Sequence, residues 1–195
     1  VEGPGSIPYT DTSIALDSWQ RPHISYRDGG SGDLKYAYYN GMSWIKTVVD
    51  SGDDAGRHTS LALDANGNAH LSYMTGGLLK YARRTRDRWL IETVDVSGQS
   101  QGGAMEIAGD GTVHVAYVDA AQYKIEYAYR DATGWHHETI EPGGQASWFP
   151  GLALDSAGQP HVVYWDPGNS VLKYAFKHAG GWEIENTGLG HPILT

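Results

Sequence analysis

The sequence predicts an all-β fold, a β-propeller with four four-stranded blades, because one segment is repeated four times along the chain. The copies are IALDSWQRPHISY at 14–26, LALDANGNAHLSY at 61–73, MEIAGDGTVHVAY at 105–117 and LALDSAGQPHVVY at 152–164. Each copy is followed by LKYA or IEYA, then by a tryptophan and a strand-like tail. The copies begin 44 to 47 residues apart, and four-stranded units at this period are typical of propellers.

Each repeat divides into four short β-like runs, which we call A, B, C and D. In the second repeat these runs are SLALD, AHLSYM, LLKYARR and WLIETVD. Apolar and polar residues alternate in A and B, as half-buried antiparallel strands require. Glycine-rich turns, ANGN and TGG, separate A from B and B from C.

The repeat boundaries predict a single domain over residues 1–195. The expected blades are 13–50, 60–95, 104–141 and 151–188, and residues 1–12 form a leading strand or loop segment. That leading segment resembles a D-to-A connection. Two alternatives therefore stay open: half of an eight-bladed ring formed by two chains, or a segment of a longer propeller array.

The positions that recur in every repeat are expected to be structural, because repeated residues usually serve packing within and between repeats. They are His23, His70, His114, His161, Tyr26, Tyr73, Tyr117, Tyr164, Trp44, Trp89, Trp135 and Trp182. Each histidine is expected to bond the aspartate that ends run A, which is Asp17, Asp64 or Asp155. The third repeat has Ala108 at that position.

The pattern LALDxxGxPHVxY…LKYA…W resembles the repeats of bacterial propellers of the BNR, sialidase-like type. The resemblance spans nearly the whole chain and implies the propeller architecture. The Asp-box of true sialidases, S-x-D-x-G-x-T-W, is absent from this sequence. An arginine triad, a tyrosine nucleophile with its glutamate and an acidic proton donor cannot be placed in equivalent positions either, so the resemblance implies no sialidase activity.

The composition excludes several classes of function. The net charge is −9, and the one arginine-rich run, RRTRDR at 83–88, is short, so nucleic acid is not an expected partner. No apolar run approaches membrane-spanning length. Cysteine is absent, which excludes disulfides, thiolate-bound zinc and a cysteine nucleophile.

The loops expected to gather on one face of a propeller are the candidate binding surface. Three of the four B-to-C loops place a carboxylate two residues after the repeated tyrosine: Asp28, Asp119 and Asp166, with Thr75 in the remaining repeat. These carboxylates could bind Ca²⁺ or sugar hydroxyls, or they could cap their own turns. No other cofactor is expected.

Aromatic and basic residues on the same loops complete the candidate site. They are Tyr9, Arg57, His58, Trp148 and Trp165, because an exposed aromatic ring beside polar groups suits a pyranose. Trp148 could instead fill the space between blades. Trp19 lies in an A-to-B turn on the opposite face, where it is expected to be a contact between subunits or a bare surface residue.

The function predicted from these patterns is a non-enzymatic recognition or assembly module, extracellular or at the cell surface. Its expected partner is a glycan or a protein, with self-association possible. One alternative is a structural unit of a surface fibre or adhesin without a small ligand. The other is a polysaccharide-active hydrolase or lyase, for which the sequence shows no established catalytic motif.

Overall fold

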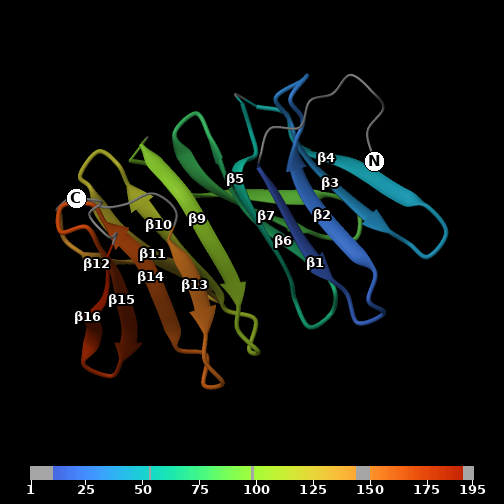
Figure 1. Ribbon diagram of the computed structural model, residues 1–195. Helices are drawn as coiled ribbons and strands as arrows, with labels where there is room; N and C mark the ends of the chain where they lie inside the picture. The colour runs from blue at the N-terminus through green and yellow to red at the C-terminus, as the bar shows by residue number, and fades with distance from the viewer. Residues whose placement is uncertain (1–10, 53, 98, 144–149, 191–195) are drawn as a thin grey trace. The chain divides into compact units, whose positions relative to one another are not determined.

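The computed structural model describes residues 11–52, 54–97, 99–143 and 150–190. Within these ranges the regular structure is β, arranged as four antiparallel sheets of four strands each. In every sheet the strands follow one another in chain order, as Figure 1 shows. This confirms the prediction of an all-β fold of four four-stranded blades. No helix long and apolar enough to cross a membrane occurs in the described ranges.

Blade 1 consists of β1 (Thr12–Leu16), β2 (Pro22–Arg27), β3 (Leu34–Tyr39) and β4 (Trp44–Asp50). Blade 2 consists of β5 (Arg57–Leu63), β6 (Ala69–Thr75), β7 (Leu78–Arg84) and β8 (Trp89–Asp95). Blade 3 consists of β9 (Ser100–Ile107), β10 (Val113–Asp119), β11 (Lys124–Asp131) and β12 (Gly134–Glu141). Blade 4 consists of β13 (Gly151–Leu154), β14 (Pro160–Asp166), β15 (Val171–His178) and β16 (Gly181–Gly190).

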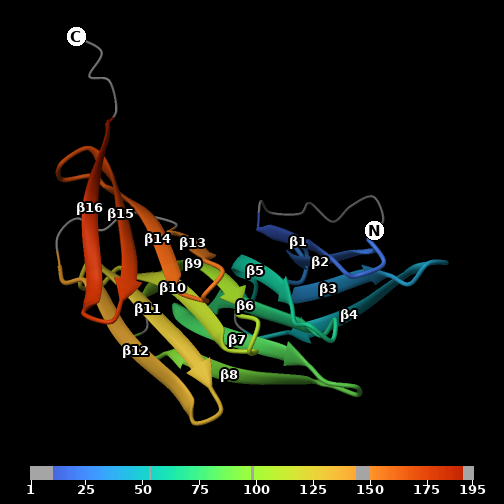
Figure 2. The same ribbon diagram turned by 90° about the horizontal axis from the view of Figure 1, so that it is seen from below.

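The chain separates into two compact units, Val1–Gly98 with blades 1 and 2 and Gln99–Thr195 with blades 3 and 4. Inside unit 1 the first strands of the two blades, β1 and β5, lie side by side (Figure 2). Inside unit 2 the corresponding strands, β9 and β13, are also in contact. That residues 1–195 form a single domain stays a prediction.

The second strand of a blade is its most buried one. Every residue of β6 and β10 is buried, whereas β4 alternates between exposed and covered residues up to its buried Val49. The second strand has a neighbour on either side and side chains packed on both faces, and it is covered completely in blades 2 and 3. The fourth strand is the edge of its sheet, and its outward face meets solvent.

The aspartate at the end of the first strand shapes the hairpin that follows it. The carboxylate of Asp64 accepts the backbone N–H groups of Asn66 at 2.9 Å and Asn68 at 2.8 Å. The matching aspartates of blades 1 and 4, Asp17 and Asp155, accept the equivalent pairs of N–H groups at 2.8–2.9 Å. The carboxylate thus satisfies two turn donors that the ladder leaves unpaired.

The repeated histidine forms its hydrogen bond with a tyrosine on the third strand. The imidazole Nδ1 lies 2.5 Å from the tyrosine hydroxyl in each of the four blades. The pairs are His23–Tyr36, His70–Tyr81, His114–Tyr127 and His161–Tyr174. Each tyrosine belongs to the LKYA or IEYA segment, so the bond ties the second strand to the third.

The aspartate expected to bond each histidine is close to it but is not its closest partner. The imidazole Nε2 of His23, His70 and His161 lies 3.5–3.7 Å from the aspartate oxygen. The turn N–H groups bind the other carboxylate oxygen, Oδ1, and the short imidazole hydrogen bond joins Nδ1 to the tyrosine. In blade 3, where Ala108 replaces the aspartate, the His114 Nε2 has no hydrogen-bond partner among the described residues.

Aromatic contacts join the two blades of each unit. The Trp89 indole of blade 2 meets the Tyr36 ring of blade 1 edge-on at 5.2 Å and donates to Thr47 at 3.3 Å. In unit 2, Trp182 meets Tyr127 at 5.1 Å and donates to Glu138 at 2.9 Å. Each pair lies beside the hydrophobic core of its own unit.

The remaining landmark residues differ in exposure. The repeated tyrosines Tyr26, Tyr73, Tyr117 and Tyr164 are all buried. The Tyr73 hydroxyl reaches back to Asp50 of blade 1, where it donates at 2.7 Å. Trp135 is half-buried, and Trp44 is 36% exposed while contacting Tyr39.

Replacing Tyr127 by phenylalanine is expected to lower the free energy of unfolding by about 1–3 kcal/mol, because it leaves the buried Nδ1 of His114 without its partner. Urea unfolding measures the loss. Tyr123→Phe is the control, since Tyr123 is 58% exposed. Equal stability of the two variants would contradict a structural role for the histidine–tyrosine bond.

Candidate functional site

The three aspartates predicted for the loop face lie where the second strand passes into the turn before the third: Asp119 and Asp166 end β10 and β14, and Asp28 directly follows β2. All three are buried: Asp28 is 7% exposed, Asp119 5% and Asp166 8%. Asp28 accepts the backbone N–H of Gly30 at 2.8 Å, and Asp119 accepts that of Ala121 at 2.9 Å. Each carboxylate therefore serves its own turn, and a ligand role for these residues stays a prediction.

A metal site would require several acidic or imidazole ligands converging on one point. Among the residues that the structure describes, no group of three or more His, Cys, Asp or Glu side chains is arranged to hold a metal ion. Two of the loop aspartates are instead paired with lysines. Lys35 contacts Asp28, and the Lys173 ammonium lies 2.8 Å from Asp166.

Asp166 and Trp165 line a cavity of about 340 Å³ in unit 2, which we call the Asp166 pocket. The Lys173 ammonium lies between two carboxylates, 2.8 Å from an oxygen of Asp166 and 2.5 Å from an oxygen of Glu141. Burial alone would raise the pKa of Asp166, but hydrogen bonds from Lys173 and Asn169 outweigh it and lower the pKa to about 2. The pocket therefore contains a lysine whose charge is already paired with two carboxylates, next to the half-buried indole of Trp165.

The other predicted loop residues are placed as follows. Arg57 donates to Asp54 at 2.6 Å. The backbone N–H of His58 donates to Asp11 at 2.9 Å, and burial lowers the pKa of the His58 imidazole although Asp11 favours its charged form. Tyr9 and Trp148 lie outside the described residues, and their predicted role is untested.

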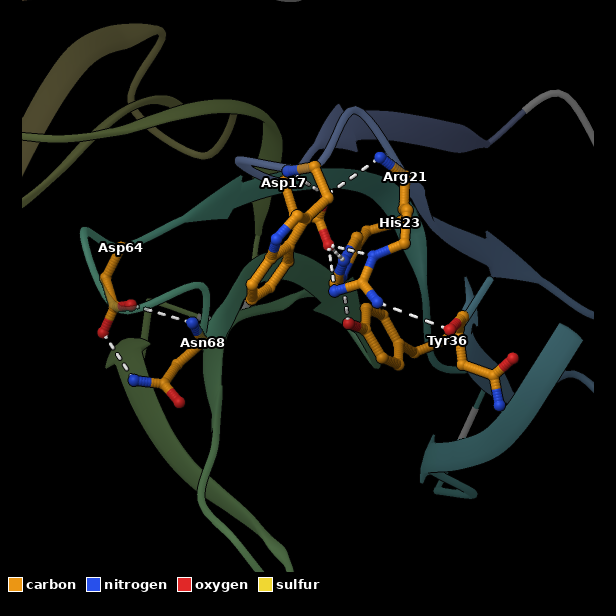
Figure 3. Close-up of polar contacts among 8 residues, drawn as sticks. Asp17, Arg21, His23, Tyr36, Asp64 and Asn68 are labelled. Atoms are coloured by element: carbon orange, nitrogen blue, oxygen red, sulfur yellow. Dashed lines mark hydrogen bonds and ion pairs between the residues drawn. The ribbon is translucent and has the colours of Figure 1, made fainter. Parts of the chain in front are cut away.

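A larger cavity lies in unit 1, between the first hairpins of blades 1 and 2. It has a volume of about 640 Å³, and we call it the blade 1–2 cleft. Figure 3 shows its polar contacts: Asp17, Arg21, His23 and Tyr36 form one connected group, and Asp64 and Asn68 form another. Both hairpins contribute to the lining, as does the turn that follows β7.

The floor of the blade 1–2 cleft is the histidine–tyrosine pair of blade 1. Burial lowers the pKa of His23, opposed by the nearby Asp17 carboxylate, so the imidazole is largely neutral at neutral pH. Burial also raises the pKa of the Tyr36 hydroxyl to about 12. The floor is therefore an uncharged, hydrogen-bonded and aromatic surface.

The rim of the cleft carries the most exposed tryptophan of the described chain. Trp19 is 73% exposed, and the Arg21 guanidinium carbon lies 4.3 Å from the centre of its ring. Arg21 in turn donates to the Asp17 carboxylate at 2.7 Å. Burial would raise the pKa of Asp17, but hydrogen bonds from Arg21 and from the Trp19 backbone lower it to about 2. The Asp17 carboxylate that caps the hairpin therefore positions Arg21, and the Arg21 guanidinium packs against the Trp19 indole.

The turn that presents Trp19 and Arg21 has an unfavourable backbone conformation. Gln20 has a φ of 61°, in the left-handed region that favours glycine. The three other blades have glycine at this position, with φ values of 77° at Gly67, 90° at Gly111 and 78° at Gly158. Strained residues of this kind concentrate at functional sites, and this one lies between the two rim residues.

Unit 2 contains a cleft of the same construction, with a volume of about 460 Å³. Its floor is His114 with Tyr127, but its rim differs, because Asp110 and Thr112 stand where blade 1 has Trp19 and Arg21. The blade 1–2 cleft is therefore the candidate site. The histidine–tyrosine floor is common to both clefts and is part of the repeated fold. The rim with Trp19 and Arg21 occurs only at the first hairpin of blade 1.

Sequence reasoning missed this site for an identifiable reason. Trp19 was expected on the face opposite the candidate loops, as a subunit contact or a bare surface residue. The available signal was the turn position itself, where three repeats have glycine and the first has glutamine beside tryptophan and arginine. The tyrosine partner of each histidine was also signalled, by a nearly constant separation of 11 or 13 residues.

No protein-family model matches the chain, and no curated protein does. Several solved structures are similar to this chain at 9–14% identity. A protein of unknown function from Dyadobacter fermentans is 12% identical with a TM-score of 0.68, covering 92% of this chain and 69% of its own. The exo-β-1,3-galactanase of Phanerochaete chrysosporium, solved with β-1,3-galactotriose, is 10% identical with a TM-score of 0.61, covering 92% and 50%.

An α-L-arabinofuranosidase from Clostridium thermocellum is 14% identical with a TM-score of 0.52, covering 89% of this chain and 70% of its own. Such likenesses concern the fold. They include β-propeller glycoside hydrolases, and this chain has a β-propeller fold with four four-stranded blades. The propeller architecture expected from the repeat resemblance is therefore confirmed.

Exchanging Gln20 and the matching glycine of blade 2 tests the strain in the rim turn. Gln20→Gly is expected to raise the free energy of unfolding by about 0.5–1 kcal/mol, because relief of the left-handed conformation exceeds the added chain entropy. Gly67→Gln should lower it by a similar amount, since no atom lies within 4 Å of a side chain added there. Thermal unfolding of both variants measures the effects, and a loss of stability in Gln20→Gly would contradict the strain.

Proposed function

We propose that this chain is a carbohydrate-binding propeller module that holds a glycan in the blade 1–2 cleft and catalyses no reaction on it. We further propose an extracellular or cell-surface location. The BNR type of the repeats, a protein partner and self-association are predictions that rest on the sequence alone.

The observation that carries the proposal is the Trp19 indole at the rim. The Arg21 guanidinium covers one face of the ring, while 73% of the residue is exposed. The other face is therefore available to stack on the C–H face of a pyranose, as aromatic residues of sugar-binding sites do. A cavity of about 640 Å³ is of the size that small-ligand sites have.

Polar groups that orient sugar hydroxyls lie on the neighbouring hairpin. Asn66 and Asn68 line the same cleft, on the blade 2 side. The Asn68 amide already donates to Asp64 at 2.8 Å, which fixes the direction of its carbonyl group. Asn66 is exposed at the tip of the turn. The Asn68 amide would orient the sugar hydroxyls, and the Trp19 indole in the same cleft would supply the contact area for the sugar ring.

The carboxylates of the cleft suit binding better than hydrolysis. Glycoside hydrolysis needs a carboxylic acid that stays protonated, so its pKa must be raised. The pKa of Asp17 is lowered to about 2, and hydrogen bonds from Asn68 lower that of Asp64 against the effect of burial. Both groups are ionised at neutral pH and accept hydrogen bonds.

The structural neighbours support a carbohydrate ligand and also favour a second candidate, a glycoside hydrolase. The galactanase and the arabinofuranosidase are named for action on carbohydrate. In this chain, partial desolvation raises the pKa of Glu106 on β9, although the residue is exposed, and Glu106 is the side chain to test as a proton donor. Glu106 does not line the blade 1–2 cleft, so hydrolysis would occur at a different place.

Trp19→Ala is expected to weaken glycan binding at least about tenfold, because it removes the stacking surface. A glycan array identifies the strongest ligand, and isothermal titration of that oligosaccharide gives the affinity. β-1,3-galactotriose is included as a probe. Met42→Ala is the matched control, since Met42 is 91% exposed and lies outside the cleft.

Trp165→Ala separates this site from the loop face predicted by sequence. If the glycan binds in the blade 1–2 cleft, affinity is unchanged in Trp165→Ala. If Trp165→Ala abolishes binding and Trp19→Ala does not, the site is the Asp166 pocket. A blank array with both neutral and acidic glycans would refute carbohydrate binding altogether.

Incubation with β-1,3-galactan and arabinan is expected to release no reducing sugar above the buffer rate, because the cleft carboxylates are ionised. A reducing-end assay measures this. Should release be found, Glu106→Gln decides whether the activity belongs to the chain. Loss of sugar release in Glu106→Gln, with an unchanged melting temperature, would show that the chain is a glycoside hydrolase and would contradict the proposal of a non-catalytic binding module.

A further inference from the structure

The blade 1–2 cleft is locally basic in an acidic protein. Three arginines, Arg21, Arg84 and Arg86, line it against two aspartates, Asp17 and Asp64. The whole chain carries a net charge of −9. A local excess of guanidinium groups in a concave surface attracts anions even when the protein as a whole is negative.

Among the residues that the structure describes, two of the three arginines are not paired with a carboxylate. Arg21 is held by Asp17 at 2.7 Å. Arg84 lies over aromatic rings instead, with its guanidinium carbon 5.4 Å from the centre of Tyr36 and 4.9 Å from that of Tyr38. Arg86 is exposed in the next turn. Within the described ranges, neither Arg84 nor Arg86 forms an ion pair.

The equivalent cleft of unit 2 shows that the fold does not require this charge. Lys177 of blade 4 takes the place of Arg84 and also lies over two tyrosines, 5.6 Å from Tyr127 and 5.3 Å from Tyr129. Its ammonium is neutralised by Glu138 at 2.5 Å. Ala179 stands where blade 2 has Arg86. The same construction therefore forms in unit 2 with one cation, Lys177, whose charge is paired with Glu138.

We infer that the blade 1–2 cleft selects an anionic glycan, a pyranose bearing a carboxylate or a sulfate ester. The inference rests on the proposed function, because Trp19 supplies the stacking surface and the arginines supply the charge recognition. The planar guanidinium donates two parallel N–H bonds to a carboxylate or sulfate. Arg84 is oriented by the tyrosine rings of the floor, and Arg86 completes the positive edge.

The test compares charged ligands with uncharged counterparts of the same sugar. The probes are trigalacturonate with its methyl ester, and a sulfated galactan oligosaccharide with its desulfated form. Titration is expected to give at least about tenfold tighter binding for one charged form than for its counterpart. Raising the salt from about 0.05 M to about 0.5 M should reduce that preference, since ion pairs at an open cleft are screened. The two pairs distinguish a carboxylate from a sulfate ligand.

Arg84→Gln combined with Arg86→Gln should abolish the preference for the charged form, so that the ratio of the charged-form affinity to the uncharged-form affinity falls to about one. Arg88→Gln is the matched control, because it removes the same charge from the same turn but does not line the cleft. Arg86→Gln alone, at an exposed position, provides the test if loss of Arg84 disturbs the tyrosines beneath it. It should reduce the preference in part.

Three results would overturn the inference. If charged and uncharged forms bind equally and binding depends on Trp19, the cleft takes neutral glycans, and the proposed function stands without the charge selection. If Arg88→Gln removes the preference as fully as the double variant, the attraction is unspecific. Failure of every charged and uncharged glycan to bind would refute both the inference and the function on which it rests.

Discussion

The hydrogen bond between the repeated histidine and the tyrosine of the following strand is the interaction on which each blade depends. It connects the second strand to the third at one end of the sheet, where the hairpin capped by aspartate begins. Both groups are polar and lie in a largely apolar interior, and burial keeps His23 and His114 neutral by lowering their pKa values. Pairing satisfies two groups that would otherwise be costly to bury.

This arrangement also explains why clefts form where they do. The histidine–tyrosine pair occupies the end of the blade below the hairpin, and the aromatic residues of the next blade in the unit pack against the same tyrosine. The two hairpins then stand apart above a shared polar floor. Unit 1 and unit 2 have the same floor, and the residues that make their rims different all lie in turns.

Much of the fold was predictable, because its signal is repetition. Four copies of one segment, at nearly constant spacing, indicated four blades and placed each strand. The closeness of His23 to Asp17 was foreseen from the hairpin, whereas its bond to Tyr36 was not, since that bond depends on the diagonal register between two strands. The candidate site escaped prediction for the opposite reason. Trp19 and Arg86 do not repeat, and only packing brings them to one cavity with Arg84.

The aspartate cap separates the shape of a hairpin from the identity of its tip. Because the carboxylate of Asp17, Asp64 or Asp155 holds the turn through backbone N–H groups, the turn restricts residue type mainly at the left-handed position occupied by Gln20 or Gly67. The chain therefore offers a set of interchangeable tips on a constant frame, much as antibody loops vary on a constant sandwich. Transplanting the tip of blade 1 onto blade 2 or blade 4, which have the same aspartate cap, would add recognition chemistry to those blades without redesign of their strands, which makes the protein a scaffold for building multivalent binders.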